Sequence, residues 1–192
     1  MKGVLLINLG SPDSPTKKDV KTYLDEFLMD ERVLDVAYWK RYVLVKGIIL
    51  NTRPKKSAAA YQKIWWDEGS PLVVLSERFQ EKLQSKLEVP VALGMRYGSM
   101  SIEKALDELS QKGVTEVYVL PLYPHYAMSS YETVVVKTEE LVAEKFPELN
   151  LHVQSVFYKD PNYIKVLAKS ISDVYSPEEF DHLLFSYHGI PE

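Results

Sequence analysis

Short apolar runs separated by amphipathic stretches recur along the whole of this chain. The runs are rich in β-branched and aromatic residues, which is typical of strands buried in a sheet. They predict strands over residues 4–8, 89–93, 114–122, 151–157 and 182–187. Between the runs, apolar residues recur at three- and four-residue spacing, and this periodicity predicts helices.

Residues that favour helix starts stand where these helical patterns begin. Thr16, followed by Asp19, resembles a capping box. The pairs Ser70-Pro71 and Asp160-Pro161 each combine an N-cap residue with a proline in the first turn. We therefore expect helices to begin after residues 16, 70 and 160.

Alternation of strands and helices is typical of an α/β fold, so we expect a doubly wound, Rossmann-like parallel sheet of four strands flanked by helices. Residues 16–88 carry helical patterns and no apparent strand, which predicts extra helices inserted between strands one and two. Residues 182–187 and the turn after them resemble the beginning of the chain. We therefore predict a first domain over residues 1–177, and over 178–192 the first strand and active-site turn of a second, similar domain that is truncated here.

The composition narrows the possible functions. The net charge is −4 and the chain has no cysteine, so we expect no nucleic-acid partner, disulfide or thiolate metal site. The first residues read as a strand and lack the features of a signal peptide, and no apolar run has the length of a membrane span. These observations favour a cytoplasmic protein.

Residues 36–50 form a largely apolar stretch with basic residues interleaved. One interpretation is a helix buried in the core. The other is an apolar lip over a ligand site, with possible peripheral contact to a membrane surface. The pattern alone does not choose between them, and it says nothing about oligomeric state.

Chemically useful side chains follow several of the predicted strands. Arg96 and Tyr97 follow the second strand, and a group of tyrosines and serines between residues 123 and 130 follows the third. Because ligands bind at the carboxyl edge of such sheets, we expect these residues to converge there. A nucleotide site is disfavoured, because the turn after the first strand has no glycine fingerprint.

Among the four histidines, His188 is the strongest candidate for chemistry. It follows the apolar run 182–187 and precedes Gly189, so it would lie at the edge of the sheet where such folds bind ligands. His125 is the second candidate because it follows the third predicted strand.

Several motifs together resemble the ferrochelatase family, whose members insert ferrous iron into a porphyrin. The matching motifs are Asn8-Leu9-Gly10-Ser11-Pro12, Arg53-Pro54, Tyr61 with Gly69-Ser70-Pro71, Met95-Arg96-Tyr97, Leu122-Tyr123-Pro124 with Tyr126, and Ser186-Tyr187-His188-Gly189-Ile190-Pro191. The resemblance implies two similar chelatase-type domains with a porphyrin cleft between them.

The resemblance also implies site residues. His188 would be the catalytic residue and a metal ligand, accepting pyrrole protons or binding the incoming iron. The implied porphyrin contacts are Leu9, Arg53, Ser70, Met95, Arg96, Tyr97, Tyr123, Tyr126, Ser129 and Ser130. His125 matches no fixed position of the family and inherits no role.

The implied reaction is insertion of ferrous iron, as substrate, into protoporphyrin IX in haem biosynthesis, with no cofactor required. Because family members are longer, we expect this chain to fold but not to catalyse insertion alone. The alternatives are a chelatase for coproporphyrin III or another metal and tetrapyrrole pair, and a non-catalytic porphyrin-binding module.

Overall fold

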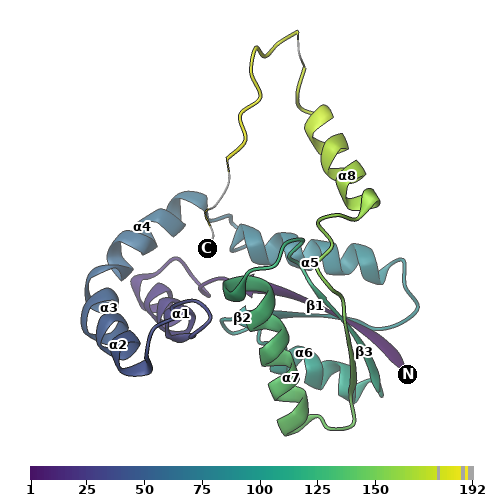
Figure 1. The fold of residues 1–192 in the computed structure, drawn as a ribbon, viewed down its shortest axis with the longest axis horizontal. Helices are drawn as coiled ribbons and strands as arrows, with labels where there is room; N and C mark the ends of the chain where they lie inside the picture. The colour runs from purple at the N-terminus through teal and green to yellow at the C-terminus, as the bar shows by residue number, and fades with distance from the viewer. Residues whose placement is uncertain (177, 187–188, 190–192) are drawn as a thin grey trace.

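The computed structural model describes residues 1–176, 178–186 and 189. Within them the chain forms one parallel four-stranded sheet with the strand order β2-β1-β3-β4 (Figure 1). The strands are β1 (Lys2–Gly10), β2 (Val91–Tyr97), β3 (Glu116–Pro121) and β4 (Asn150–Val153). The predicted α/β fold with a four-stranded parallel sheet is confirmed.

Helices fill the connections between the strands, and one more helix follows β4. Those before β2 are α1 (Lys17–Met29), α2 (Tyr38–Tyr42), the π-helical turn η1 (Val43–Ile49), α3 (Leu50–Thr52), α4 (Pro54–Ile64) and α5 (Pro71–Gln84). The later ones are α6 (Ile102–Gln111), the π-helical turn η2 (Met128–Glu132), α7 (Thr133–Lys145) and α8 (Pro161–Ser172). The excursion predicted between the first two strands is therefore confirmed as helical, and the helix starts expected after residues 16, 70 and 160 are all present.

The two faces of the sheet are buried by different helices. Leu5 and Ile7 of β1 point into a core formed with α6 and α7, whereas Leu6, between them, points into a core formed with α5. This alternation follows from the two-residue repeat of a strand. The central strand is consequently apolar on both faces, as expected for a buried parallel strand.

The inserted helices α1 to α4 have a core of their own beside the sheet (Figure 1). Val20, Leu24 and Leu28 line one face of α1 and pack against Val45 of η1 and residues of α3 and α4. The predicted apolar stretch is thus helical from Tyr38 onward, but only a narrow side of it is buried. Much of its remaining apolar surface is exposed; the exposed apolar residues are Val36, Tyr38, Trp39, Tyr42, Val43, Leu44 and Ile48.

All four strands differ at their ends from the prediction. The strand predicted over 4–8 runs from Lys2 to Gly10. The strand predicted over 89–93 extends to Tyr97, because β1 pairs with it as far as Gly10 opposite Tyr97. The strand predicted over 114–122 is shorter at both ends. The strand predicted over 151–157 ends at Val153, after which the amides of Phe157 and Tyr158 turn to the carbonyl oxygen of Pro124.

The strand predicted over 182–187 is not formed in its described part. Residues 182–186 are irregular and pair with no strand of the sheet, and Leu184 is 91% exposed. A strand is stable only against a partner strand that satisfies its backbone groups, and the described chain offers none beside this segment. Residues 178–192 as the start of a second domain remain a prediction.

None of the helices in the described residues is both long and apolar enough to span a membrane.

Candidate functional site

The carboxyl edge of the sheet gathers residues from three distant segments of the chain. The chain leaves β1 toward β2 and leaves β3 toward β4, in opposite directions along the sheet. Such a switch point opens a crevice where α/β folds bind their ligands. Tyr97 at the end of β2 and Tyr123 just after β3 both lie at this edge.

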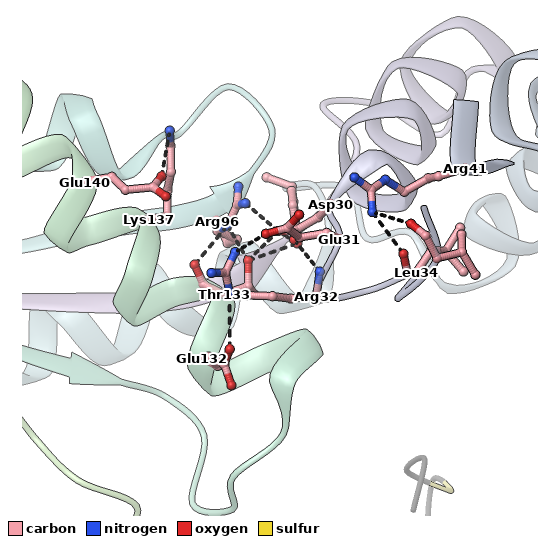
Figure 2. Close-up of polar contacts among 12 residues, drawn as sticks. Asp30, Glu31, Arg32, Leu34, Arg41, Arg96, Glu132, Thr133, Lys137 and Glu140 are labelled. Carbon is pink, nitrogen blue, oxygen red and sulfur yellow. Dashed lines mark hydrogen bonds and ion pairs between the residues drawn. The ribbon is translucent and has the colours of Figure 1, made fainter. Parts of the chain in front are cut away.

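A buried polar cluster centred on Asp30 lies at this edge (Figure 2). One oxygen of Asp30, Oδ2, accepts hydrogen bonds from Arg96 Nη2 at 2.5 Å, Tyr97 Oη at 2.8 Å and Thr133 Oγ1 at 2.5 Å. The other oxygen, Oδ1, accepts from the amide of Arg32 at 2.8 Å. Arg96 also donates from Nε to Thr133 Oγ1 at 2.7 Å. The cluster therefore joins the end of α1, the end of β2 and the start of α7.

The cluster keeps Asp30 ionised. Burial by itself would raise the pKa of Asp30, but the hydrogen bonds from Thr133, the Arg32 amide and Tyr97, together with the charge of Arg96, outweigh it. The pKa of this carboxyl consequently lies below its usual value. The guanidinium of Arg96 is thus paired with an acidic neighbour of the same chain, Nη2 lying 2.5 Å from Oδ2 of Asp30.

Aromatic rings surround this cluster. Phe27 meets the ring of Tyr97 edge-on at 5.3 Å, and Tyr23 meets it edge-on at 6.4 Å. Tyr61 in turn lies edge-on to Tyr23 at 6.4 Å. Burial raises the pKa of the phenols of Tyr23, Tyr61 and Tyr97, so all three remain neutral over the physiological pH range. They form a rigid, uncharged aromatic wall inside the fold, in which Tyr97 is 1% and Tyr23 is 6% exposed.

A pocket of about 240 Å³ opens beside this wall. Three of the predicted porphyrin contacts line it together, namely Ser70, Met95 and Tyr97. Ser70 is the N-cap of α5, although its side chain makes no capping hydrogen bond. The hydroxyl of Ser11, also in the pocket lining, has no hydrogen-bond partner among the described residues.

Tyr123, another of the predicted porphyrin contacts, has an unsatisfied hydroxyl. Its hydroxyl is buried, yet it has no hydrogen-bond partner within the described part of the chain. Burial raises the pKa of this phenol, and the nearby phenols of Tyr23 and Tyr97 raise it further. A buried donor without a partner is costly, so this hydroxyl is an unsatisfied polar group beside Tyr23 and Tyr97 within the described residues.

The remaining predicted contacts are not gathered at this wall. Tyr126 is exposed and donates a hydrogen bond to Glu132, while Ser129 and Ser130 lie half-buried in η2. Leu9 is half-buried near the end of β1, and Arg53 is exposed between α3 and α4.

The two candidate histidines have different outcomes. His188 lies outside the described residues, as does Tyr187, so its predicted role stays a prediction. His125 stacks on the ring of Tyr158 at 5.2 Å and is exposed. Among the described residues there is no group of three or more histidine, aspartate or glutamate side chains able to hold a metal ion.

Sequence reasoning missed Asp30, Thr133 and Tyr23. Asp30 follows the last residue of α1, a place where an acidic residue is usually a solvated surface group. Thr133 stands inside a helical pattern, where a hydroxyl carries no clear signal. Their role depends on segments that are 66 to 103 residues apart, and one sequence gives no sign of such contacts.

Comparison with known proteins identifies relatives over the full length of the chain. The family model described as Ferrochelatase matches residues 1–192. The chain is 48% identical over 190 residues to a ferrochelatase of Azotobacter vinelandii and 49% identical over 193 residues to one of Opitutus terrae. These alignments cover 98% and 99% of this chain and 56% of each relative. The chain thus spans little more than half the length of the curated relatives it matches.

Proposed function

The chain belongs to the ferrochelatase family, because the family model matches all of it; on this basis we propose that the protein to which the chain belongs inserts ferrous iron into protoporphyrin IX. The observation that carries the proposal is this match over residues 1–192. Ferrous iron is the substrate and no cofactor takes part. The activity is proposed for a protein as long as the relatives, of which this chain covers about half.

Metallation requires the loss of two pyrrole protons and the approach of the metal to a pyrrole nitrogen. We assign proton acceptance and metal contact to His188, since an imidazole that titrates near neutrality suits both tasks. Ferrous iron accepts neutral imidazole as a ligand. This assignment follows from the family resemblance of the motif around His188.

The neutral aromatic wall suits the porphyrin face. The rings of Tyr97 and Tyr23 are held by edge-on contacts and cannot ionise near neutral pH, so they give the pocket that Tyr97 lines a fixed apolar backing. A rigid wall can use the binding energy of the macrocycle to bend it toward the metallated geometry. The assigned porphyrin contacts are Leu9, Arg53, Ser70, Met95, Arg96, Tyr97, Tyr123, Tyr126, Ser129 and Ser130.

Arg96 has a restricted part in this assignment. Its Nη2 and Nε already donate to Asp30 and Thr133, and its side chain is only 14% exposed. We therefore assign to Arg96 a contact with the porphyrin rather than a two-pronged grip on a propionate. Arg53, which is exposed, is better suited to a propionate.

The protein is proposed to be cytoplasmic and to contact a membrane peripherally through residues 36–50. Tyr38 and Trp39 are each 65% exposed, and Val43 and Ile48 are more than half exposed. Lys40 lies among them. Exposed aromatic and aliphatic side chains beside lysine are typical of interfacial helices.

The membrane contact is tested by co-sedimentation with vesicles of phosphatidylcholine and phosphatidylglycerol. Replacing Trp39 and Val43 with Glu is expected to abolish binding to these vesicles. The same change at Leu75, which is 53% exposed on α5, is the control and leaves binding intact. Equal binding by all variants would exclude this helix as the contact.

The catalytic proposal is tested by anaerobic insertion assays with ferrous iron and either protoporphyrin IX or coproporphyrin III. A protein of the relatives' length should metallate protoporphyrin, and His188→Ala should abolish turnover. Preference for coproporphyrin would support the alternative chelatase, and binding without turnover would support a porphyrin-binding module. The 192-residue chain alone is expected to be inactive, and detectable insertion by it would contradict that expectation.

A further inference from the structure

Asp30 occupies an unusual position for an acidic residue at a helix end. It is 9% exposed, and its side chain is 4% exposed. A carboxylate in such surroundings is tolerated only when its oxygens are paired and hydrogen-bonded. Both oxygens meet this requirement, and three of the four donors come from residues far away in the sequence (Figure 2).

The donors come from segments that carry assigned porphyrin contacts. Arg96 and Tyr97 end β2, whose Met95 and Tyr97 line the pocket. Thr133 begins α7 directly after η2, which contains Ser129 and Ser130. Asp30 itself precedes the loop that leads to α2, η1 and α3. One carboxylate therefore fixes three pieces of the candidate site relative to one another.

The residues that follow Asp30 are also held by polar contacts of buried or half-buried side chains. The guanidinium of Arg41, 6% exposed, donates from Nη1 to the carbonyl oxygens of Leu34 and Val36. The side chain of Arg32 forms an ion pair with Glu132 of η2, with Nε 3.4 Å from Oε1. Asp30 is thus the buried member of a series of hydrogen bonds and ion pairs that joins residues 30–41 to β2, η2 and α7.

We propose that Asp30 is a positioning residue of the porphyrin pocket, which holds the Tyr97 hydroxyl and the Arg96 guanidinium so that the aromatic wall keeps its place. The identity of the ligand rests on the proposed function, whereas the mechanical role of Asp30 does not. Asp30 acts through Tyr97 and does not touch the substrate. Its carboxylate has the charge and the number of acceptor sites that the three donors require.

The first test measures binding of metal-free protoporphyrin IX to the 192-residue chain by quenching of tryptophan fluorescence. Asp30→Asn is expected to weaken binding about tenfold, because one acceptor oxygen becomes a donor and the Tyr97 hydroxyl loses its acceptor. In a Tyr97→Phe background the same change should weaken binding less than twofold. Equal effects in both backgrounds would show that Asp30 does not act through Tyr97.

The control is Val117→Ala. Val117 is buried near the amino end of β3, away from the carboxyl edge of the sheet where the Asp30 cluster lies, so this change loosens the core without touching the cluster. It should lower stability while leaving porphyrin affinity unchanged. If Val117→Ala weakens binding as much as Asp30→Asn does, the role of Asp30 is merely structural and the inference fails.

The second test needs no ligand and separates this inference from the proposed function. Amide hydrogen exchange of residues 31–37, 94–98 and 130–134 should become at least about tenfold faster in Asp30→Asn than in Val117→Ala at matched global stability. Unchanged exchange there overturns the inference even if porphyrin binds. Faster exchange without any porphyrin binding to the unaltered chain supports the mechanical role of Asp30, and the proposed function is then judged by the insertion assay on a protein of the relatives' length.

Should Asp30→Asn fail to fold, Thr133→Val provides the same tests. It removes the hydrogen bond that Thr133 donates to Asp30 and the one that it accepts from Arg96 Nε, and it leaves the ion pair between Asp30 and Arg96 in place. The expected weakening of porphyrin binding is then about threefold. Unchanged binding and unchanged exchange in Thr133→Val would overturn the inference.

Discussion

Gly10 ends β1 at a point where no side chain fits. Its φ angle is +100°, and a Cβ atom built on it would lie 2.0 Å from the carbonyl oxygen of Tyr97. The close approach allows the chain to leave β1 beside the end of β2, where the candidate pocket opens. The glycine is therefore required both by backbone conformation and by space.

We predict that Gly10→Ala destabilises the protein by about 3 kcal/mol, because the alanine must adopt a disfavoured backbone conformation and displace β2. The free energy of unfolding from urea titration measures this loss. Gly47→Ala is the control, since Gly47 lies in a helical turn with nothing within 4 Å of its Cβ position. It should be neutral or stabilise by up to about 1 kcal/mol, and a similar loss at both sites would refute the steric explanation.

The charge of Asp30 predicts a pH dependence of stability. Its pKa is lower in the folded chain than in the unfolded chain, so the unfolded state binds the proton more readily. The stabilisation is therefore complete above the unfolded carboxyl pKa of about 3.9 and is lost as pH falls through the folded value. Thermal unfolding between pH 2 and pH 6 should show a steeper acid loss for the natural chain than for Asp30→Asn, and parallel curves would contradict this.

Two helix starts show how much of an N-cap can be predicted from the local sequence. Thr16 and Ser70 are both N-cap residues, as their sequence contexts predict, but their side chains behave differently. The Thr16 hydroxyl accepts a hydrogen bond from the amide of Asp19, whereas the Ser70 hydroxyl makes no capping bond. The position of an N-cap residue can therefore be predicted from sequence, whereas the surrounding structure determines whether its side chain makes a capping hydrogen bond.

We predict that Thr16→Ala lowers the free energy of unfolding by about 1 kcal/mol, since α1 loses a cap and packs into a core. Ser70→Ala should cost less than about 0.5 kcal/mol because it removes no capping bond. Chemical denaturation of both variants compares them directly. A larger loss for Ser70→Ala would show that its hydroxyl has a structural role.

Strands were located from sequence, but their ends were not. The apolar runs identified all four strands, because burial on both faces of a parallel sheet leaves a strong local signal. The extension of β2 through Met95 to Tyr97 depends on pairing with β1, and no local pattern reports a partner about 87 residues away. For the same reason residues 182–186 have the composition of a strand without forming one.

At the scale of the whole molecule, stability is concentrated before residue 154. Every member of the three core clusters lies between Val4 and Val153. By contrast, α8 has no buried residue and stands apart from the sheet (Figure 1). The apolar side chains of α8, including Leu167 at 47% exposure, contribute little to the cores of the described chain.

A matched pair of leucines tests this distribution. Leu106→Ala in α6, where the leucine is fully buried, should cost about 3 kcal/mol. Leu167→Ala in α8 should cost less than about 0.5 kcal/mol. Urea unfolding followed by circular dichroism provides both values, and comparable losses would show that α8 is packed against the rest of the molecule in solution.

The candidate site was predicted in part. Ser70, Met95 and Tyr97, which the family resemblance implies as porphyrin contacts, line one pocket, and their contact with a porphyrin stays a prediction. Asp30 and Thr133 were not predictable, since their importance arises only when α1, β2 and α7 meet. Sequence motifs thus identify pocket-lining residues such as Tyr97 more readily than the supporting residues, Asp30 and Thr133, that hold them in place.

The central place of β1 has a consequence for the order in which the chain folds. β1 is made first, yet Val4 pairs with Val91 and Lys2 with Glu116. At a synthesis rate of about 5–20 residues per second, the first strand waits roughly 4 to 17 seconds for a neighbour. Helices α1 to α4, which have their own core, can assemble during this interval. The apolar residues of β1 are unprotected meanwhile, so nascent chains in which β2 has not yet been made should be the ones that chaperones bind.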